Sequence, residues 1–329
     1  MSLVLAFIGW GVVVAQEQSS GIWRVDNGDS QDIEAHGVCQ RVTNGHASGQ
    51  GLMVPTGTEA EWTAFQDNLP GGVTIEDCGP SRELYAWGNN NYAALGDGTI
   101  IDRTAPVLST EISSLSFTKI YAGNSFSCGL TSSGAAYCWG LDNEGQLGDG
   151  SVSHGTTPEY SDEPLAVAGG HSFSSLSLGD AYACGVRTDG AAYCWGRNTY
   201  GQLGDNGLTS SSEPVAVVGG HSFSSIATGY DHTCAIRTDG AAYCWGYGYE
   251  GRLGSGTTPY QQRTPLAVSG GHSFSQISAG RKNTCALRTD GRVYCWGDGA
   301  YGYGSGSAST NDVLIPTLIS GGATYAKVV

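Results

Sequence analysis

Paired cysteines are the feature of this sequence whose residue type and spacing most directly predict a chemistry. Eight of the ten cysteines form four pairs, each with nine intervening residues: Cys128–Cys138, Cys184–Cys194, Cys234–Cys244 and Cys285–Cys295. A zinc knuckle needs two to four intervening residues, so this spacing is wrong for one. A glycine-centred turn such as Thr188-Asp189-Gly190 lies midway in each pair, so a β-hairpin would set the cysteines about 4.5 Å apart at Cα. We therefore expect four hairpin disulfides, with four pairs of reduced, buried thiols as the alternative.

The two remaining cysteines are expected to form a fifth disulfide, Cys39–Cys78, because the even count leaves no orphan. Disulfides persist in oxidising compartments, so the pattern predicts an extracellular or cell-surface protein. The net charge of −15, from 15 basic and 30 acidic residues, opposes binding to phosphate backbones. Nucleic acid is therefore not expected as a partner.

Catalytic motifs are absent from the sequence, which contains no G-x-S-x-G, Walker A or H-E-x-x-H pattern. We therefore expect a protein that is not an enzyme and has no cofactor, with an active site built on loops as the alternative.

Two sets of residues could suggest a metal, and for both a structural role is favoured. Aspartates in loops offer oxygen ligands for calcium, but they lack EF-hand spacing and are also common turn formers. These are Asp97-Gly98, Asp149-Gly150 and Asp205-Asn206. Histidines after Gly-Gly belong to separate repeats and are expected to pack or form turns: His171, His221 and His272. His232 is expected to make a structural hydrogen bond, and no metal site is predicted.

A longer repeat surrounds each cysteine pair. The segment C-G-V-R-T-D-G-A-A-Y-C-W-G at 184–196 recurs closely at 234–246 and 285–297, and more loosely at 128–140. Its tryptophan stands at positions 87, 139, 195, 245 and 296, in steps of 52, 56, 50 and 51 residues. A period near 50 built from strand-like segments is typical of a β-propeller. The tryptophans are expected to pack between blades rather than to stack on a ligand.

One repeat unit contains four predicted strands, at 173–178, 182–187, 191–195 and 214–218. Whole units begin at Phe117, Phe173, Phe223 and Phe274. The segments 73–77, 83–87 and 106–108 would supply strands two to four of a further blade, whose first strand would be residues 323–329. The prediction is an all-β propeller of five four-stranded blades, closed by the C-terminal strand; a fragment of a larger ring is the alternative.

The repeat resembles that of the regulator-of-chromosome-condensation family. The resemblance rests on W-G-x-N-x-x-G-Q-L-G-D at 195–205, a near match at 139–149 and the second-strand pattern at 229–235, and it covers about three quarters of the chain. It implies a propeller. The best-known members have seven blades, and the nuclear members lack hairpin disulfides. The nuclear exchange factor's roles on a small GTPase and on chromatin are not carried over, because no residues here match a GTPase-facing wedge. Exported bacterial members that act by binding are more similar in setting.

The chain before the repeats is expected to have three parts. Residues 1–15 are apolar and too short for a membrane span of about 20 residues, so they are either a signal peptide cleaved after Val13-Val14-Ala15 or a retained assembly tail. As a tail they would contact membrane only transiently. The assembly residues would be Leu3, Leu5, Phe7, Ile8, Trp10, Val12, Val13 and Val14. Residues 16–38 form a polar arm and residues 39–80 a small disulfide-closed module with a helix at 58–65, before the propeller at 73–329.

Positions that change between repeats while their neighbours stay constant are the candidate binding residues. One set precedes the first cysteine of a unit and another follows each Trp-Gly, and the second is rich in tyrosine, which suits contacts with proteins or sugars. The candidates are Asp180, Tyr182, Tyr230, Asp231, Arg281, Lys282, Tyr200, Tyr247, Tyr249, Tyr301 and Tyr303. Ordinary drift of loop sequences is the alternative.

The sequence therefore predicts a non-enzymatic, extracellular structural or adhesive propeller, with the subunit of a pilus-like filament as one form of that role. The expected partner is another copy of the chain or a surface glycan, and no GTPase is expected. The alternative is a secreted, soluble, inhibitor-like propeller that binds a protein or a glycan.

Overall fold

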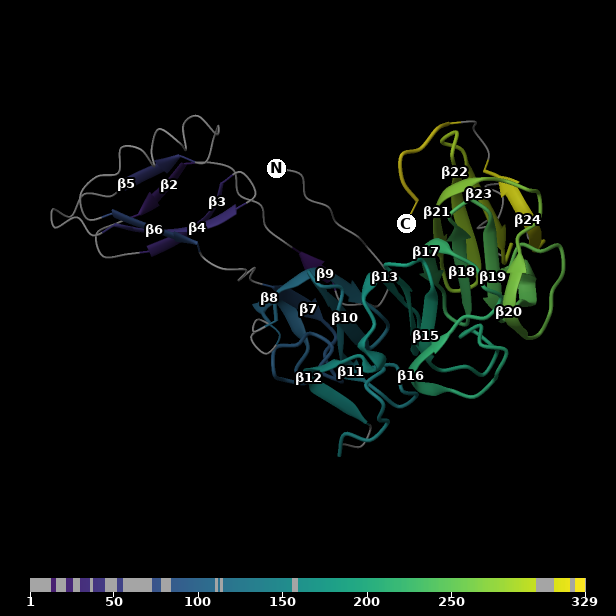
Figure 1. Ribbon diagram of the computed structural model, residues 1–329, viewed down its shortest axis with the longest axis horizontal. Helices are drawn as coiled ribbons and strands as arrows, with labels where there is room; N and C mark the ends of the chain where they lie inside the picture. The colour runs from purple at the N-terminus through teal and green to yellow at the C-terminus, as the bar shows by residue number, and fades with distance from the viewer. Residues whose placement is uncertain are drawn as a thin grey trace. The chain divides into compact units, whose positions relative to one another are not determined.

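A computed structural model describes residues 84–109, 112, 115–155, 159–299, 311–319 and 323–328, together with the backbone of six earlier strands (Figure 1). The chain divides into two compact units: residues 1–6 with 15–84, and residues 7–14 with 85–329. Among the described residues, no helix has both the length and the apolar character needed to cross a membrane.

The smaller unit contains two antiparallel sheets. Strand β2 (Ile22–Val25) pairs with β5 (Leu52–Pro55), and β3 (Ser30–Ala35), β4 (Val38–Asn44) and β6 (Val73–Asp77) form a second sheet in the order β3-β4-β6. The expected helix at 58–65 and the Cys39–Cys78 bond lie outside what the structure describes.

The position of strand β6 differs from the prediction, in which this segment is the second strand of the first blade. It pairs instead with β4, with Val42 opposite Ile75. The tight β3–β4 hairpin leaves one edge of β4 open, and β6 satisfies the backbone groups along that edge.

The larger unit is a β-propeller built from five sheets, four of them with four strands in chain order. The second blade contains β9 (Phe117–Ala122), β10 (Phe126–Thr131), β11 (Ala136–Leu141) and β12 (Tyr160–Ala166), and the third contains β13 (Phe173–Leu178), β14 (Tyr182–Arg187), β15 (Ala192–Gly196) and β16 (Ser211–Ala216). The fourth blade contains β17 (Phe223–Thr228), β18 (His232–Arg237), β19 (Ala242–Gly246) and β20 (Gln262–Ala267). The last blade contains β21 (Phe274–Ala279), β22 (Asn283–Arg288), β23 (Val293–Gly297) and β24 (Val313–Leu318). The repeat period thus corresponds to one blade, as the sequence predicts.

The first blade is completed differently from the expectation. Its sheet has the order β1-β7-β8, formed by Val13–Ala15, Tyr85–Gly88 and Arg103–Leu108. The C-terminal segment lies against the last blade instead, where the Tyr325 N–H donates to the Gly291 carbonyl at 2.7 Å. The first residue of β17 makes the same bond to the blade before it, from Phe223 to Gly190 at 2.8 Å. The C-terminal segment thus occupies the position of the first strand that would follow the last blade, as expected, but among the described residues it pairs with no strand of the first blade, where β1 lies beside β7.

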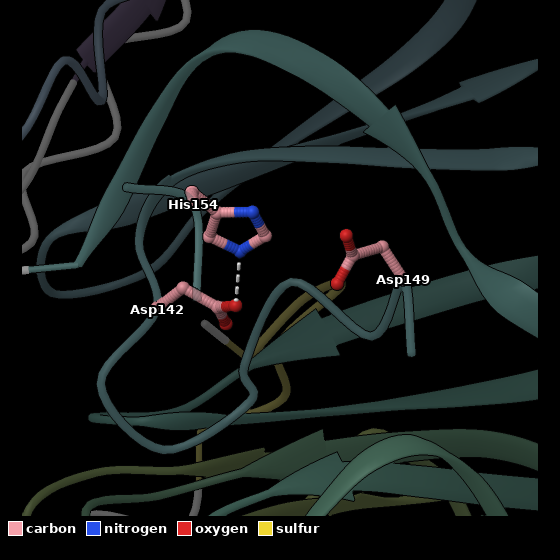
Figure 2. Close-up of side chains that lie close together, drawn as sticks. All are labelled: Asp142, Asp149 and His154. Atoms are coloured by element: carbon pink, nitrogen blue, oxygen red, sulfur yellow. Dashed lines mark hydrogen bonds and ion pairs between the residues drawn. The ribbon is translucent and has the colours of Figure 1, made fainter. Parts of the chain in front are cut away.

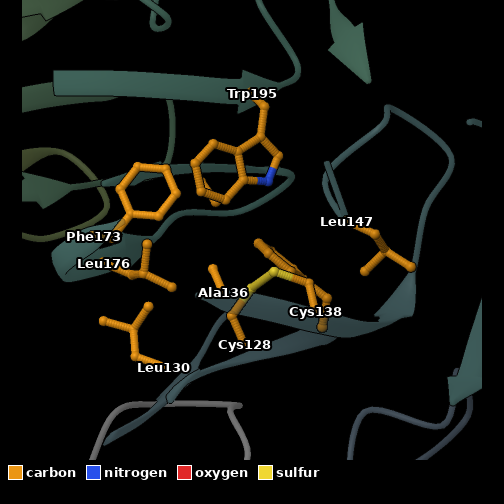
Figure 3. Close-up of a cluster of buried hydrophobic side chains, with 10 residues drawn as sticks. Cys128, Leu130, Ala136, Cys138, Leu147, Phe173, Leu176 and Trp195 are labelled. Carbon is orange, nitrogen blue, oxygen red and sulfur yellow. A yellow bond between two sulfur atoms is a disulfide. The ribbon is translucent and has the colours of Figure 1, made fainter. Parts of the chain in front are cut away.

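Hairpin disulfides form within four blades, as predicted. Each cysteine pair is directly opposed in register between the second and third strands of its blade. The Cα–Cα distances are 4.1, 4.0, 4.1 and 4.1 Å for Cys128–Cys138, Cys184–Cys194, Cys234–Cys244 and Cys285–Cys295. Figure 3 shows the first of these bridges within the apolar core between two blades, below Trp195 and Phe173.

The repeated tryptophans join neighbouring blades, which confirms their expected packing role. Trp139, Trp195, Trp245 and Trp296 are at most 1% exposed, and each donates its Nε1–H to a backbone carbonyl of the preceding blade. The bond from Trp245 to Gln202 is 2.9 Å long. At Gly204 the backbone has φ +70, and a Cβ atom would lie 2.7 Å from Trp245 Nε1. The second glycine of the G-Q-L-G motif is therefore required for the tryptophan to reach its acceptor.

Candidate binding surface

The two sets of variable residues meet on one surface of the propeller. Arg197 follows Trp195-Gly196, whereas Asp180 and Asp231 precede the first cysteines of neighbouring blades. The Arg197 guanidinium lies 2.9 Å from Asp180 Oδ2 and 2.7 Å from Asp231 Oδ1. The side chains that differ between repeats are thus joined across two blades by one shared cation.

The electrostatics of this group couple both carboxylates to the Arg197 guanidinium. Burial raises the pKa of Asp231 although Arg197 opposes the shift. Burial would lower the pKa of Arg197, but Asp231 and Asp180 outweigh it and raise that pKa. One guanidinium therefore bridges two carboxylates, and the attraction of both for Arg197 holds the three side chains together.

A ring with two cations extends the surface outward. The Tyr230 ring is 38% exposed, and its centroid lies 5.5 Å from Arg197 Cζ and 5.1 Å from Arg281 Cζ. Cation–π contacts of this kind hold an aromatic face in place without burying it. We call Asp180, Arg197, Tyr230, Asp231 and Arg281 the arginine cluster.

A second ion group lies in the next loop. The carboxylate of Glu250 pairs with the Arg252 guanidinium and, at 2.8 Å, with Lys282 Nζ. Lys282 also lies 3.4 Å from Asp298 Oδ2. Arg252 is 3% exposed, stands where the second and third blades have glutamine in G-Q-L-G, and places its Cζ 4.6 Å from the Tyr247 ring centroid. A buried cation thus fixes the base of the neighbouring aromatic group.

Four tyrosines form that aromatic group, which we call the tyrosine cluster. The Tyr247 ring centroid lies 4.5 Å from that of Tyr200, 5.6 Å from Tyr260 and 6.0 Å from Tyr249, with which it is stacked. Tyr249 and Tyr260 are 55% and 60% exposed. Tyr260 is not among the residues predicted from the sequence, because those lie directly after Trp-Gly, whereas Tyr260 stands further along the loop that carries Tyr247. Exposed, mutually supported rings can bind the apolar face of a sugar or of a protein segment at low entropic cost.

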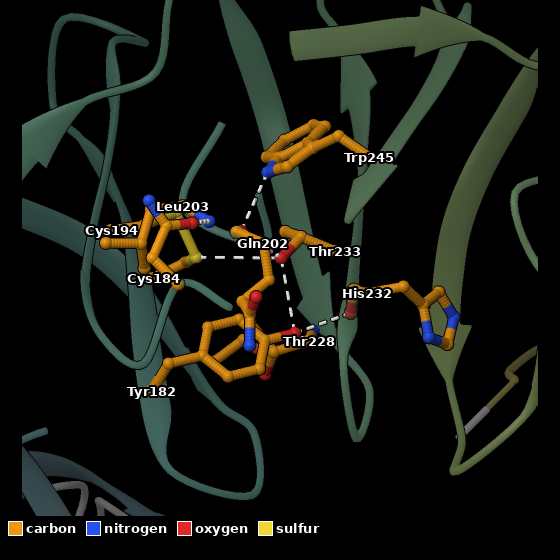
Figure 4. Close-up of a disulfide and its surroundings, with 11 residues drawn as sticks. Tyr182, Cys184, Cys194, Gln202, Leu203, Thr228, His232, Thr233 and Trp245 are labelled. Atoms are coloured by element: carbon orange, nitrogen blue, oxygen red, sulfur yellow. Dashed lines mark hydrogen bonds between the residues drawn. A yellow bond between two sulfur atoms is a disulfide. The ribbon is translucent and has the colours of Figure 1, made fainter. Parts of the chain in front are cut away.

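Tyr182 is not a binding residue, contrary to the sequence prediction. It is fully buried, and its hydroxyl donates to the His232 carbonyl at 2.5 Å and accepts from Thr233 Oγ1 at 3.2 Å (Figure 4). Burial strongly raises its pKa. Phe126 and His232 at the equivalent positions are also fully buried, so this position points into the interface between blades in three of the repeats; Asn283 in the last blade is half-buried. Tyr301, Tyr303 and the assembly residues before Val13 lie outside the described residues.

The repeated histidines are packing residues in separate blades, as predicted. The rings of His171, His221 and His272 stack on the tyrosine of the third strand at centroid distances of 4.3, 4.5 and 4.5 Å. Burial lowers the pKa of each. His232 makes the expected structural hydrogen bond, with 2.9 Å between its Nε2 and Thr284 Oγ1.

Comparisons with known proteins agree with this architecture. Residues 83–328 match the family model described as the RCC1-like domain. The chain is 28% identical over 300 residues to the human E3 ubiquitin-protein ligase HERC2, covering 86% of this chain and 6% of that protein. It is 30% identical over 264 residues to the Ultraviolet-B receptor UVR8 of Arabidopsis thaliana, covering 78% and 47%. The chain therefore spans less than half the length of these relatives.

Two solved structures have the same fold. A chain in the crystal structure of Kap60 bound to yeast RCC1 (Prp20) superposes with a TM-score of 0.64 at 21% identity, covering 74% of this chain and 58% of that chain. Human WBSCR16 superposes with a TM-score of 0.63 at 20% identity, covering 76% and 64%.

Proposed function

Because this chain belongs to the RCC1-like domain family of β-propellers, we propose that it is a non-enzymatic extracellular protein that binds through its propeller loops and serves as a structural or adhesive surface subunit. One observation carries the proposal: most of the residues that vary between repeats form a connected aromatic and charged surface over three blades, whereas the core is built mainly from constant residues such as the tryptophans and cysteines. Such a division is expected when the scaffold is fixed and recognition is carried by loops.

The extracellular setting is supported by the four hairpin disulfides, because bonds of this kind are rare where thiols are kept reduced. The net charge of −15 supports leaving nucleic acid out of the proposal. The partner we propose is a protein surface, including another copy of this chain, or a glycan.

The pairing of β1 supports a structural role. Val13–Ala15 joins the sheet of β7 and β8, although the smaller unit lies between β1 and β7 in the sequence. A short strand connected in this way can complete the sheet of its own chain or that of a neighbour, as in strand donation between subunits. Cleavage after Ala15 would remove β1 from the blade, so its place in the sheet favours a retained N-terminal segment.

The assembly role is tested on protein isolated from its native exterior, by electron microscopy together with determination of the N-terminal residue. Ordered filaments whose subunits retain residues 1–15, and which a variant lacking these residues cannot form, are the expected result. Dispersed propellers that begin near Gln16 would refute the structural role and leave the second candidate, a secreted binding protein, which the exposed tyrosine cluster favours.

The binding role is tested separately with a glycan array and a cell-adhesion assay. Replacing Tyr249 and Tyr260 together with alanine should lower binding about tenfold or more, because both rings are exposed and face the same partner. Replacing Tyr325, which is 43% exposed and outside the cluster, should leave binding unchanged. Equal loss in both variants would show that the tyrosine cluster is not the binding surface.

A further inference from the structure

Three side chains in the loop between β11 and β12 converge on one point, as Figure 2 shows. The ligand atoms of Asp142, Asp149 and His154 all lie within 4.8 Å of one another. Asp142 is completely buried, and the other two are half-buried. His154 Nε2 lies 2.6 Å from Asp142 Oδ2. The group combines two carboxylates with an imidazole, a donor set that suits a divalent transition metal.

The other blades show what this loop does without such a group. At the position of Asp142 the third blade has Asn198, whose Oδ1 accepts the Leu203 N–H at 3.0 Å and whose Nδ2 donates to Asp205 Oδ1 at 3.1 Å. The first blade has the same pair of bonds, made by its own asparagine at distances of 2.9 and 3.0 Å. In both blades the asparagine side chain therefore donates a hydrogen bond to the carboxylate of the loop aspartate.

The second blade keeps one of these bonds and loses the other. Asp142 Oδ1 still accepts the Leu147 N–H at 2.8 Å. A carboxylate has no N–H to donate, so Asp149 faces a second carboxylate where the equivalent Asp205 meets an amide. The pair therefore needs a positive group or a proton that the asparagine-containing loops do not need.

His154 stands in the segment that makes this unit the longest. The step from Trp139 to Trp195 is 56 residues, against 50 to 52 for the others. Glu159 Oε2 accepts the His154 backbone N–H at 2.7 Å and so holds the loop that carries the imidazole. The aspartate and the extra length thus occur together, and the extra length places a nitrogen ligand above two oxygen ligands.

We propose that Asp142, Asp149 and His154 bind one divalent transition-metal ion of the Zn²⁺ class, a site that ties the longest loop of the propeller to its blade. Two ligands on a tetrahedral zinc lie about 3.4 Å apart, given bonds of about 2.0–2.2 Å. Ion binding therefore separates the 2.6 Å pair of His154 and Asp142 and releases the proton between them to solvent. The His154 side chain is 13% exposed and lies on a loop, so it can make this movement. Ca²⁺ would need about six to eight oxygen ligands and does not favour imidazole.

The test is isothermal titration calorimetry of the full chain, freed of metal with EDTA, against ZnCl₂ and CaCl₂ at pH 7.5. The wild type should bind one Zn²⁺ per chain more tightly than Ca²⁺, with weaker binding at pH 5.5 because protons compete for the ligands. Asp142→Asn restores the residue found at the equivalent position of the third blade and should weaken Zn²⁺ binding about 100-fold or more. His154→Gln should have the same effect, and Asp205→Asn in the blade without an imidazole should have none.

Three results would overturn the proposal: no saturable Zn²⁺ binding to the wild type, binding that survives both Asp142→Asn and His154→Gln, or preference for Ca²⁺. Weakening by Asp205→Asn as strong as that by Asp142→Asn would also overturn it, because it would indicate general attraction to an acidic surface. Thermal unfolding of each variant in EDTA separates loss of the ligand from loss of the fold, since Asp142→Asn should unfold no earlier than the wild type.

Discussion

Replacing His232 with phenylalanine is expected to make the propeller less sensitive to acid. His232 is completely buried between two blades, its Nε2 contacts only the Thr284 hydroxyl among its hydrogen-bond partners, and its Nδ1 has no partner within the described part of the chain. Burial, aided by the Arg252 charge, lowers its pKa to about 3. The equivalent positions of other blades hold Phe126 and Tyr182, both fully buried, so a phenylalanine has a precedent in the same backbone.

The size of the effect follows from the two pKa values. In the unfolded chain His232 takes up a proton near pH 6.5, whereas in the folded protein it stays neutral down to about pH 3. Its contribution to stability is therefore fully present above pH 6.5 and is lost as the pH falls through that value toward 3. Between pH 7 and pH 5 the loss is about 2 kcal/mol in the free energy of unfolding. This figure hardly changes if the folded pKa is 4 instead of 3, because the unfolded value dominates above pH 5.

Denaturant unfolding with the disulfides intact measures the effect at pH 7 and pH 5 for the wild type, His232→Phe and His232→Tyr. The quantity that matters is the difference between the wild type and each variant, since the other histidines contribute equally to all three proteins. The free energy of unfolding of the wild type, taken relative to that of each variant, should fall by about 2 kcal/mol between pH 7 and pH 5. A difference that stays constant over this range would show that His232 is protonated in the folded protein and would refute the reasoning.

Three further perturbations have definite expected results. Replacing both Cys234 and Cys244 with alanine should lower the free energy of unfolding by about 2–3 kcal/mol, the loop-closure value for about ten residues. Because the variant lacks this disulfide, added reductant should cause no further loss of stability from it. Trp245→Phe should cost about 1 kcal/mol in denaturant unfolding because the Gln202 carbonyl loses one of two donors; no loss would contradict a role for that bond. Asp142→Asn should raise the free energy of unfolding at pH 7 in EDTA by about 1–3 kcal/mol. The pKa of this carboxyl is raised to about 6, so its stabilising protonated form is lost as the pH rises through that value, and the gain should fade toward pH 4. A variant less stable than the wild type at pH 7 would contradict that sign.

The hairpin disulfides and the blade period could be predicted because short-range information fixes them. The turn midway between Cys184 and Cys194 sets the register of the hairpin, and the register alone decides that the two sulfurs meet. The place of β6 could not be predicted in the same way. Its sequence suits any open strand edge, and the choice between β4 and the first blade depends on which edge remains free after the other strands have paired.

The binding surface was only partly predictable, because variation between repeats was taken as a sign of exposure. Tyr182 and His232 vary and are fully buried, since each side chain is fitted to its neighbour across the blade interface. Asp180 and Asp231 vary too, and their carboxylates, although mostly buried, reach the partly exposed Arg197. Residues of one variable segment thus differ in the direction of their side chains, a distinction that needs the strand geometry as well as the sequence.

Residues that differ from their equivalents in other blades say most about function where two such residues lie in contact. An aspartate at position 142 would leave two facing carboxylates in a buried loop, and the longer loop supplies His154 beside them. An arginine at position 252 would bring a charge into a site that the second and third blades fill with glutamine, and Glu250 supplies its counter-charge. Independent drift has no reason to place the compensating residue within reach of the change. Coupled departures of this kind therefore identify the two loops in which this propeller differs chemically from its own repeat, one suited to a metal ion and the other to a partner's surface.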